Sequence, residues 1–165
     1  MTFLDNELSI RTIGLVLQEA GLHPYVKGID CYGIHRGGDD YEVLTERLPE
    51  IYIWKTVSQD LFDWRDDKRL LDCAANFFNA NHFPVRAIIG YDMIRFVLNT
   101  ELISVEQFSG RIMSWLDQIE ESLDLFGQCC AIVIRDHDKK DLYKVTEQLL
   151  DPTFDNPWLK GQKGS

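Results

Sequence analysis

The sequence lacks any uninterrupted apolar run of about 20 residues, the length that a helix needs to cross the hydrocarbon core of a bilayer. Its first residues, Met1 to Glu7, also lack the basic and then apolar order of a secretory signal peptide. We therefore expect a cytoplasmic protein that has no membrane partner.

Cysteine is scarce and badly spaced for metal binding. The four cysteines, Cys31, Cys73, Cys129 and Cys130, form no C-x-x-C pair, and no histidine stands at a zinc-ligand spacing from them. The vicinal pair Cys129 and Cys130 could be redox-active, but small buried thiols in a reducing compartment explain all four more simply. We expect no metal site and no cofactor.

Basic residues are fewer than acidic residues in this sequence. The chain has 17 Lys and Arg against 27 Asp and Glu, which gives a formal net charge of −10. Because the acidic residues are spread along the chain, the whole surface should repel nucleic acid and anionic lipid. A basic or mixed-charge protein is the natural complement, although the same charge also serves solubility.

The motifs of common hydrolases are absent as well. The four histidines are scattered, and neither H-E-x-x-H nor G-x-S-x-G occurs. Asp136 and Asp138 begin a calcium-loop pattern, but Asp141 stands where that loop needs glycine for its turn. The sequence thus predicts a protein that is not an enzyme.

The chain contains enough apolar material for a real core. Of its 165 residues 45% are hydrophobic and 12% aromatic, which suits one domain of ordinary size. We assign residues 1–135 to a single α+β domain and residues 136–165 to a C-terminal extension, first helical and then irregular.

Periodicity predicts the elements of this domain. Apolar residues at helical spacing predict helices over about 7–20, 66–82 and 104–135, and a shorter one over 140–150. Ser104 with Gln107 forms a capping box for the longest helix. The sequence predicts two short Gly-bounded strands, at 22–28 and 31–35. It also predicts two β-hairpins, at 41–57 and 85–103. The predicted fold is an antiparallel sheet of about five strands with helices on one face, in the order α-β-β-β-α-β-β-α.

This arrangement carries a family resemblance. The helix end Ala75-Asn76-Phe77-Phe78-Asn79, the hairpin over 85–98 and the capped amphipathic helix resemble the YbjN-like family of candidate bacterial sensory-transduction regulators, over about residues 7–128. That family shares the fold of the type III secretion chaperones. The resemblance implies a small acidic protein that forms homodimers and holds an unfolded or extended partner segment on apolar surface. The loop 37–40 and the tail after Gln128 have no counterpart in this family.

One short motif suggests an alternative. Arg36-Gly37-Gly38-Asp39-Asp40-Tyr41 resembles the glycine-rich hairpin of diguanylate cyclases, in which carboxylates hold magnesium. Only 36 residues precede Gly37, too few for the strand and helix that such a site requires upstream. A turn between two strands is the simpler interpretation, and a nucleotide-binding or signalling enzyme that uses Gly37–Tyr41 is the alternative function.

The leading function is a non-catalytic protein-binding module, chaperone-like or regulatory. Alternation over residues 51–57 places Tyr52 and Trp54 on the sheet face opposite to Ile51 and Ile53. If helices cover one face only, this pair is a candidate partner-binding patch, since aromatic anchors dominate interfaces. If helices and tail cover both faces, the pair belongs to the core, and both interpretations stay open. Further partner-binding candidates are Trp115 on the long helix and Trp158 in the tail.

Overall fold

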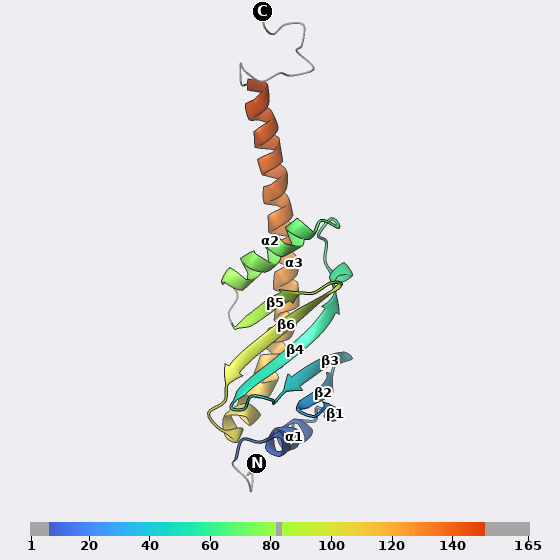
Figure 1. The fold of residues 1–165 in the computed structure, drawn as a ribbon, viewed down its shortest axis with the longest axis vertical. Helices are drawn as coiled ribbons and strands as arrows, with labels where there is room; N and C mark the ends of the chain where they lie inside the picture. Colours follow the sequence, from blue (N-terminus) through green and yellow to red (C-terminus); the bar gives the residue numbers. More distant parts are fainter. Residues whose placement is uncertain (1–6, 82–83, 151–165) are drawn as a thin grey trace, which may run out of the picture.

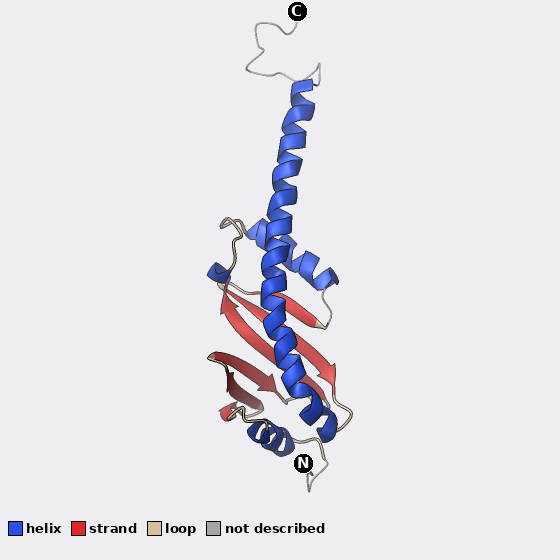
Figure 2. Cartoon of the chain, turned by 180° about the vertical axis from the view of Figure 1, so that it is seen from behind, coloured by secondary structure: helices blue, strands red, loops and turns tan. Residues whose placement is uncertain are grey.

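The computed structural model describes residues 7–81 and 84–150, with side chains as far as Lys140. Six antiparallel strands form one sheet in the order β1-β2-β3-β4-β6-β5. The helices α1, α2 and α3 lie on one face of this sheet (Figures 1 and 2). The strands are β1 (Tyr25–Gly28), β2 (Cys31–Arg36), β3 (Asp39–Leu44), β4 (Glu50–Ser58), β5 (Val85–Ile89) and β6 (Met93–Glu101), and the helices are α1 (Ile10–Glu19), η1 (Gln59–Leu61), α2 (Lys68–Asn81) and α3 (Val105–Leu150).

The predicted fold class is confirmed, with one strand more than expected. The order is α-β-β-β-β-α-β-β-α: all four strand segments read from the sequence before α2 form strands, whereas the predicted order counted three there. β1 has only four residues and pairs with β2 through an irregular register between Val26 and Gly28.

Local capping explains where the first and last helices begin. Ser9 Oγ accepts from the N–H of Thr12, whose hydroxyl in turn accepts from the N–H of Ser9. At the start of α3, Ser104 Oγ accepts from the N–H of Gln107 at 3.0 Å, and Gln107 Oε1 accepts from the N–H of Ile103 at 2.7 Å. The Ser104–Gln107 cap predicted from the sequence therefore exists.

The predicted break between two C-terminal helices is wrong. α3 runs continuously from Val105 to Leu150, and its last turns extend beyond the sheet (Figure 1). No glycine or proline lies between Gln128 and Leu150 to end it. Asp138, between the two helices predicted from the sequence, accepts two hydrogen bonds from Arg65 at 2.6 and 2.7 Å, which holds α3 to the loop before α2.

The core fills the space between the sheet and the helices. Its centre is an aromatic cluster in which Phe126 of α3 meets Phe62, Phe78 and Phe96 at ring-centroid distances of 4.8, 5.7 and 5.5 Å. The edge-to-face angles are those that aromatic pairs favour. α3 is thereby fixed across the sheet.

The two faces of β4 differ as the alternation predicts. Ile51 and Ile53 are fully buried under the helices, whereas Tyr52 and Trp54 point to the other face. Trp54 is nevertheless only 9% exposed, and the Arg95 guanidinium lies 4.6 Å from the centroid of its ring. Neighbouring side chains therefore cover Trp54 on a face that α1, α2 and α3 leave open.

Within residues 7–81 and 84–150, no helix combines the length and the apolar character that crossing a membrane requires.

Candidate functional site: a cleft inside the sheet

The sheet opens between β3 and β4. These strands pair only from Glu42–Trp54 to Leu44–Tyr52. β4 nevertheless continues to pair with β6 as far as Ser58, and β3 pairs with β2 as far back as Asp39. Beyond Trp54 the two strands diverge (Figure 2), so that each has a free edge in the middle of the sheet.

A cavity of about 730 Å³ occupies this opening, and we call it the β3–β4 cleft. One wall comes from the start of β3, the other from the end of β4, and α3 supplies Leu123. A second cavity of about 660 Å³ adjoins the cleft, since both are lined by Leu61 and Leu123. The residues lining the cleft are Gly38, Asp39, Asp40, Lys55, Thr56, Val57, Ser58, Asp60, Leu61 and Leu123, and the second cavity adds Phe62, Glu120, Glu121, Asp124 and Gly127.

The glycine-rich motif forms the turn at the rim of this cleft. Gly37 and Gly38 have φ values of 58° and 84°, in the left-handed region that favours glycine. They join β2 to β3, as the turn interpretation of this motif predicts. The turn brings Asp39 to the cleft wall.

A buried lysine links three elements at the base of the cleft. Lys55 of β4 is 8% exposed, and its ammonium donates to Asp39 of β3 at 2.9 Å and to Glu120 of α3 at 2.6 Å. The hydroxyl of Tyr41 also donates to Glu120, and Arg36 pairs with Asp117 of α3. These contacts hold the β2–β3 hairpin against α3, and the Lys55–Asp39 pair links β3 to the end of β4 across the cleft.

Both ionisable groups at the centre of this cluster keep their protons. Burial alone would lower the pKa of Lys55, but its hydrogen bonds to Glu120 and Asp39 outweigh burial and raise the pKa. Burial, and then the hydrogen bond to Glu120, raise the pKa of Tyr41 well above its ordinary range. The cluster is thus a structural ion pair with a neutral phenol.

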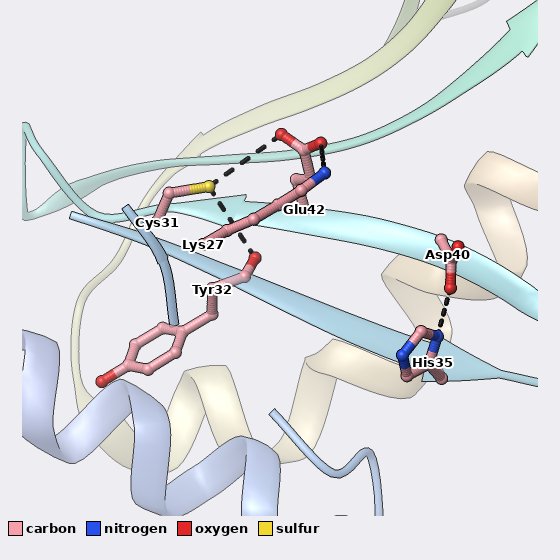
Figure 3. A network of polar contacts seen from close by, with 6 residues as sticks. All are labelled: Lys27, Cys31, Tyr32, His35, Asp40 and Glu42. Atoms are coloured by element: carbon pink, nitrogen blue, oxygen red, sulfur yellow. Dashed lines mark hydrogen bonds and ion pairs between the residues drawn. The ribbon is translucent and has the colours of Figure 1, made fainter. Parts of the chain in front are cut away.

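The two carboxylates of the Gly-Gly-Asp-Asp motif lie on opposite faces of β3. Asp39 faces the helices and pairs with Lys55, whereas Asp40 pairs with His35 on the other face (Figure 3). Consecutive strand residues point to opposite sides, so this arrangement does not bring both carboxylates to one magnesium ion. Across the part of the chain that the structure describes, no three His, Cys, Asp or Glu side chains gather as a metal site.

The open face beside the cleft is covered by polar contacts. Glu42 pairs with Lys27 and accepts from the Cys31 thiol, whose sulfur lies 4.0 Å from Glu42 Oε2 (Figure 3). Tyr25 stacks on His35 with ring centroids 5.1 Å apart. Burial raises the pKa of the Cys31 thiol, which argues for a packing role rather than a reactive one.

The aromatic residues proposed from the sequence do not gather at one place. Tyr52 is partly exposed and donates to Glu50 at 2.9 Å, and Trp54 is buried beneath Arg95 with no partner for its indole N–H among the described residues. Trp115 is 8% exposed and lies 6.1 Å from Phe108, so it belongs to the core. Trp158 lies outside the described residues. The partner-binding role of these four residues stays a prediction.

Gly38, Asp39 and Asp40 belong to the motif that suggested a nucleotide site, but the sequence did not predict Lys55 or Leu61 as site residues. Leu61, which both cavities share, is the last residue of η1, the short helix after β4, and has 59% of its surface exposed. The signal that could have indicated the site is Lys55, a charged residue on the buried face of an otherwise apolar alternation. A lysine at such a position needs carboxylate partners from elsewhere in the chain.

The comparisons with known proteins bear on the fold. No protein-family model matches the chain, and no curated protein matches its sequence. The crystal structure of YbjN, a candidate transcription regulator from E. coli, superposes with a TM-score of 0.55 and 13% sequence identity, over 75% of this chain and 93% of the YbjN chain. The fold relationship expected from the sequence is thereby confirmed, and this chain has the fold of YbjN.

Proposed function

We propose that this chain is a non-catalytic protein-binding module, chaperone-like or regulatory, which holds a segment of a partner protein in the β3–β4 cleft. The observation that supports the proposal best is the cleft itself, which opens within the sheet and has apolar residues on its floor. The cleft and the adjoining cavity, of about 730 and 660 Å³, are each as large as a typical small-ligand pocket.

The character of the lining favours a peptide over a polar metabolite. Leu61, Leu123 and Phe62 supply apolar surface where the two cavities meet. An exposed leucine in a concave site is the kind of anchor position that protein interfaces bury. Among the described lining residues Lys55 is the one cation, and it is already neutralised by Asp39 and Glu120, which disfavours a phosphate ligand.

Chemistry in the cleft has little support. The described lining residues include neither a histidine nor a cysteine, and Lys55 holds its proton in an ion pair. Among the described lining residues, the carboxylates and the hydroxyls of Thr56 and Ser58 therefore have no histidine beside them to complete a catalytic pair of the Ser–His or Cys–His kind.

We also propose that the chain forms homodimers, as the YbjN-like resemblance implies. Phe77 of α2 and Met113 of α3 retain 41% and 39% of their surface exposure, which leaves apolar area for a second copy to cover.

The cleft proposal is tested by comparing two leucine-sized residues of similar exposure. Peptides that bind the full chain are first selected from a random display library. Fluorescence anisotropy then measures their affinity for the original chain and for the variants Leu61→Ser and Ile88→Ser. Leu61 lines the cleft, whereas Ile88 is 53% exposed on β5. We expect Leu61→Ser to weaken binding about tenfold or more, since a buried leucine contributes ~1.5–3 kcal/mol, and Ile88→Ser to leave it unchanged.

Selected peptides that bind the Leu61→Ser chain as tightly as the original chain would contradict the proposed site. A loss confined to Ile88→Ser would instead place binding on the open face of the sheet.

A further inference from the structure

We infer that the segment held in the β3–β4 cleft is a basic, extended stretch of the partner that adds as a strand to the free edge of β4 over Lys55–Ser58. The inference rests on the proposed function and specifies its partner. It draws on the register of the sheet and on the charges around the cleft.

The end of β4 is a strand edge without a neighbour on one side. Pairing with β6 continues through Lys55–Phe96, Thr56–Arg95, Val57–Ile94 and Ser58–Met93, whereas pairing with β3 stops at Trp54. Alternate backbone N–H and C=O groups over these four residues therefore point into the cleft. Among the described residues, no side chain hydrogen-bonds to the backbone of Lys55, Thr56 or Val57.

A free edge of this kind is a template for another strand. Proteins usually shield such edges with a helix, a loop or an inward-pointing charge, and extended peptides bind where they are left open. Here the Lys55–Asp39 ion pair crosses the cleft on the side of the helices, from Lys55 next to the last β3–β4 pair to Asp39 at the start of β3. The edge of β4 that has no pairing with β3 runs over four residues, Lys55–Ser58, on the order of 13 Å of strand, and the cleft is widest between Gly38 and Ser58.

The charges select a basic segment. The linings of the two cavities carry six carboxylates and one lysine, and the lysine is already paired. Asp60, Glu121 and Asp124 are exposed and have no ion-pair partner among the described residues. Lysine or arginine side chains of a partner would meet these carboxylates at the rim, and the chain's net charge of −10 would steer such a partner toward the protein.

Strand geometry then gives the order of residues in the segment. Successive side chains of an added strand point alternately toward α3, where Leu61 and Leu123 offer apolar surface, and toward solvent. We therefore expect alternation of apolar and basic residues in the bound segment.

The first test uses two defined nine-residue peptides. One alternates lysine and valine, the other alternates glutamate and valine, and both have blocked ends. Fluorescence anisotropy with the full chain should show binding of the lysine peptide, at least tenfold weaker binding of the glutamate peptide, and weaker binding of the lysine peptide at higher salt. Equal binding of both peptides would overturn the basic character of the partner.

The second test asks whether the peptide binds as a strand. N-methylation removes the N–H of chosen residues, and the N–H groups of the lysines and of the valines point to opposite edges of a strand. Methylating one of the two sets should weaken binding about tenfold, and methylating the other set should change it little. If both methylated peptides bind like the parent peptide, strand addition is refuted while protein binding in the cleft still stands.

The third test locates the charges with matched variants of the chain. Asp60→Asn with Asp124→Asn should weaken the lysine peptide several-fold and reduce the salt dependence of binding. Glu19→Gln with Glu101→Gln removes the same charge away from the cleft and should leave binding unchanged. Equal effects of the two pairs would refute the site. A chain that binds display-selected peptides through Leu61 but not the lysine peptide would refute this inference alone, and a chain that binds neither would refute the proposed function as well.

Discussion

Removal of the Lys55 ammonium probes the cluster that shapes the cleft. In Lys55→Met the side chain keeps most of its aliphatic packing, but the hydrogen bonds to Asp39 at 2.9 Å and to Glu120 at 2.6 Å disappear. The two carboxylates then face each other without a cation between them. The β2–β3 hairpin loses its direct ionic link to β4, and we expect a measurable loss of stability.

The size of the loss follows from the exposure of the partners. Each charge-assisted hydrogen bond contributes about 1.5–3 kcal/mol when it is well buried. The side chains of Asp39 and Glu120 are 41% and 36% exposed, so water replaces part of what each loses. We therefore expect Lys55→Met to lower the free energy of unfolding by about 2 kcal/mol, and Glu120→Gln in the same chain to restore about half of it.

The assay is urea unfolding of the original chain and both variants at pH 7 and above pH 10. The folded-state pKa values of Lys55 and Tyr41 are raised above their ordinary values of 10.5 and 10.0. A raised pKa stabilises the fold fully below the ordinary value, and this stabilisation is lost as the pH rises toward the folded-state value. The original chain should therefore lose stability above about pH 10, and Lys55→Met should lose less. A loss at pH 7 below about 0.5 kcal/mol, or the same alkaline profile in both chains, would refute this account of the cluster.

Two further predictions concern buried side chains, and a third concerns the proposed homodimer. Trp54→Ala should lower the free energy of unfolding by ~3 kcal/mol because the ring is 9% exposed. Tyr52→Ala should lower it by only ~1 kcal/mol, since Tyr52 is partly exposed. Equal losses in urea unfolding would contradict this difference. Cys73 is exposed and should react with a disulfide reagent at neutral pH well before Cys130, because burial raises the pKa of the Cys130 thiol to about 11. Similar reaction rates of the two thiols would contradict the buried position of Cys130. Light scattering at tens of micromolar should give twice the chain mass, and a value of 19.2 kDa would refute the homodimer.

Local signals made most of the fold predictable. The cap at Ser104 and the apolar stripe of α3 depend on residues a few positions apart, so the sequence contains them directly. The first helix was predicted to begin at about residue 7, but it begins at Ile10, behind a cap at Ser9 that was not predicted. The predicted break near residue 135 was wrong because charged residues without a glycine or proline do not stop a helix that has begun.

The cleft depends on information that no local pattern holds. Its existence follows from the register at which β3 leaves β4 after Trp54, and that register is set by contacts of the hairpin with α3, such as Tyr41 with Glu120, far apart in the chain. Alternation correctly placed Tyr52 and Trp54 on one face, but whether Trp54 was covered depended on Arg95 of a strand that follows much later.

The central claim is that the β3–β4 cleft receives a partner segment, and amide chemical-shift mapping with the alternating lysine–valine peptide tests it most directly. We predict that the largest shifts fall on Gly38–Asp40 of the turn, on Lys55–Leu61 at the end of β4, and around Leu123 of α3. Shifts centred instead on Tyr52 and Ile88 of the open face, or no shifts at millimolar peptide, would contradict it.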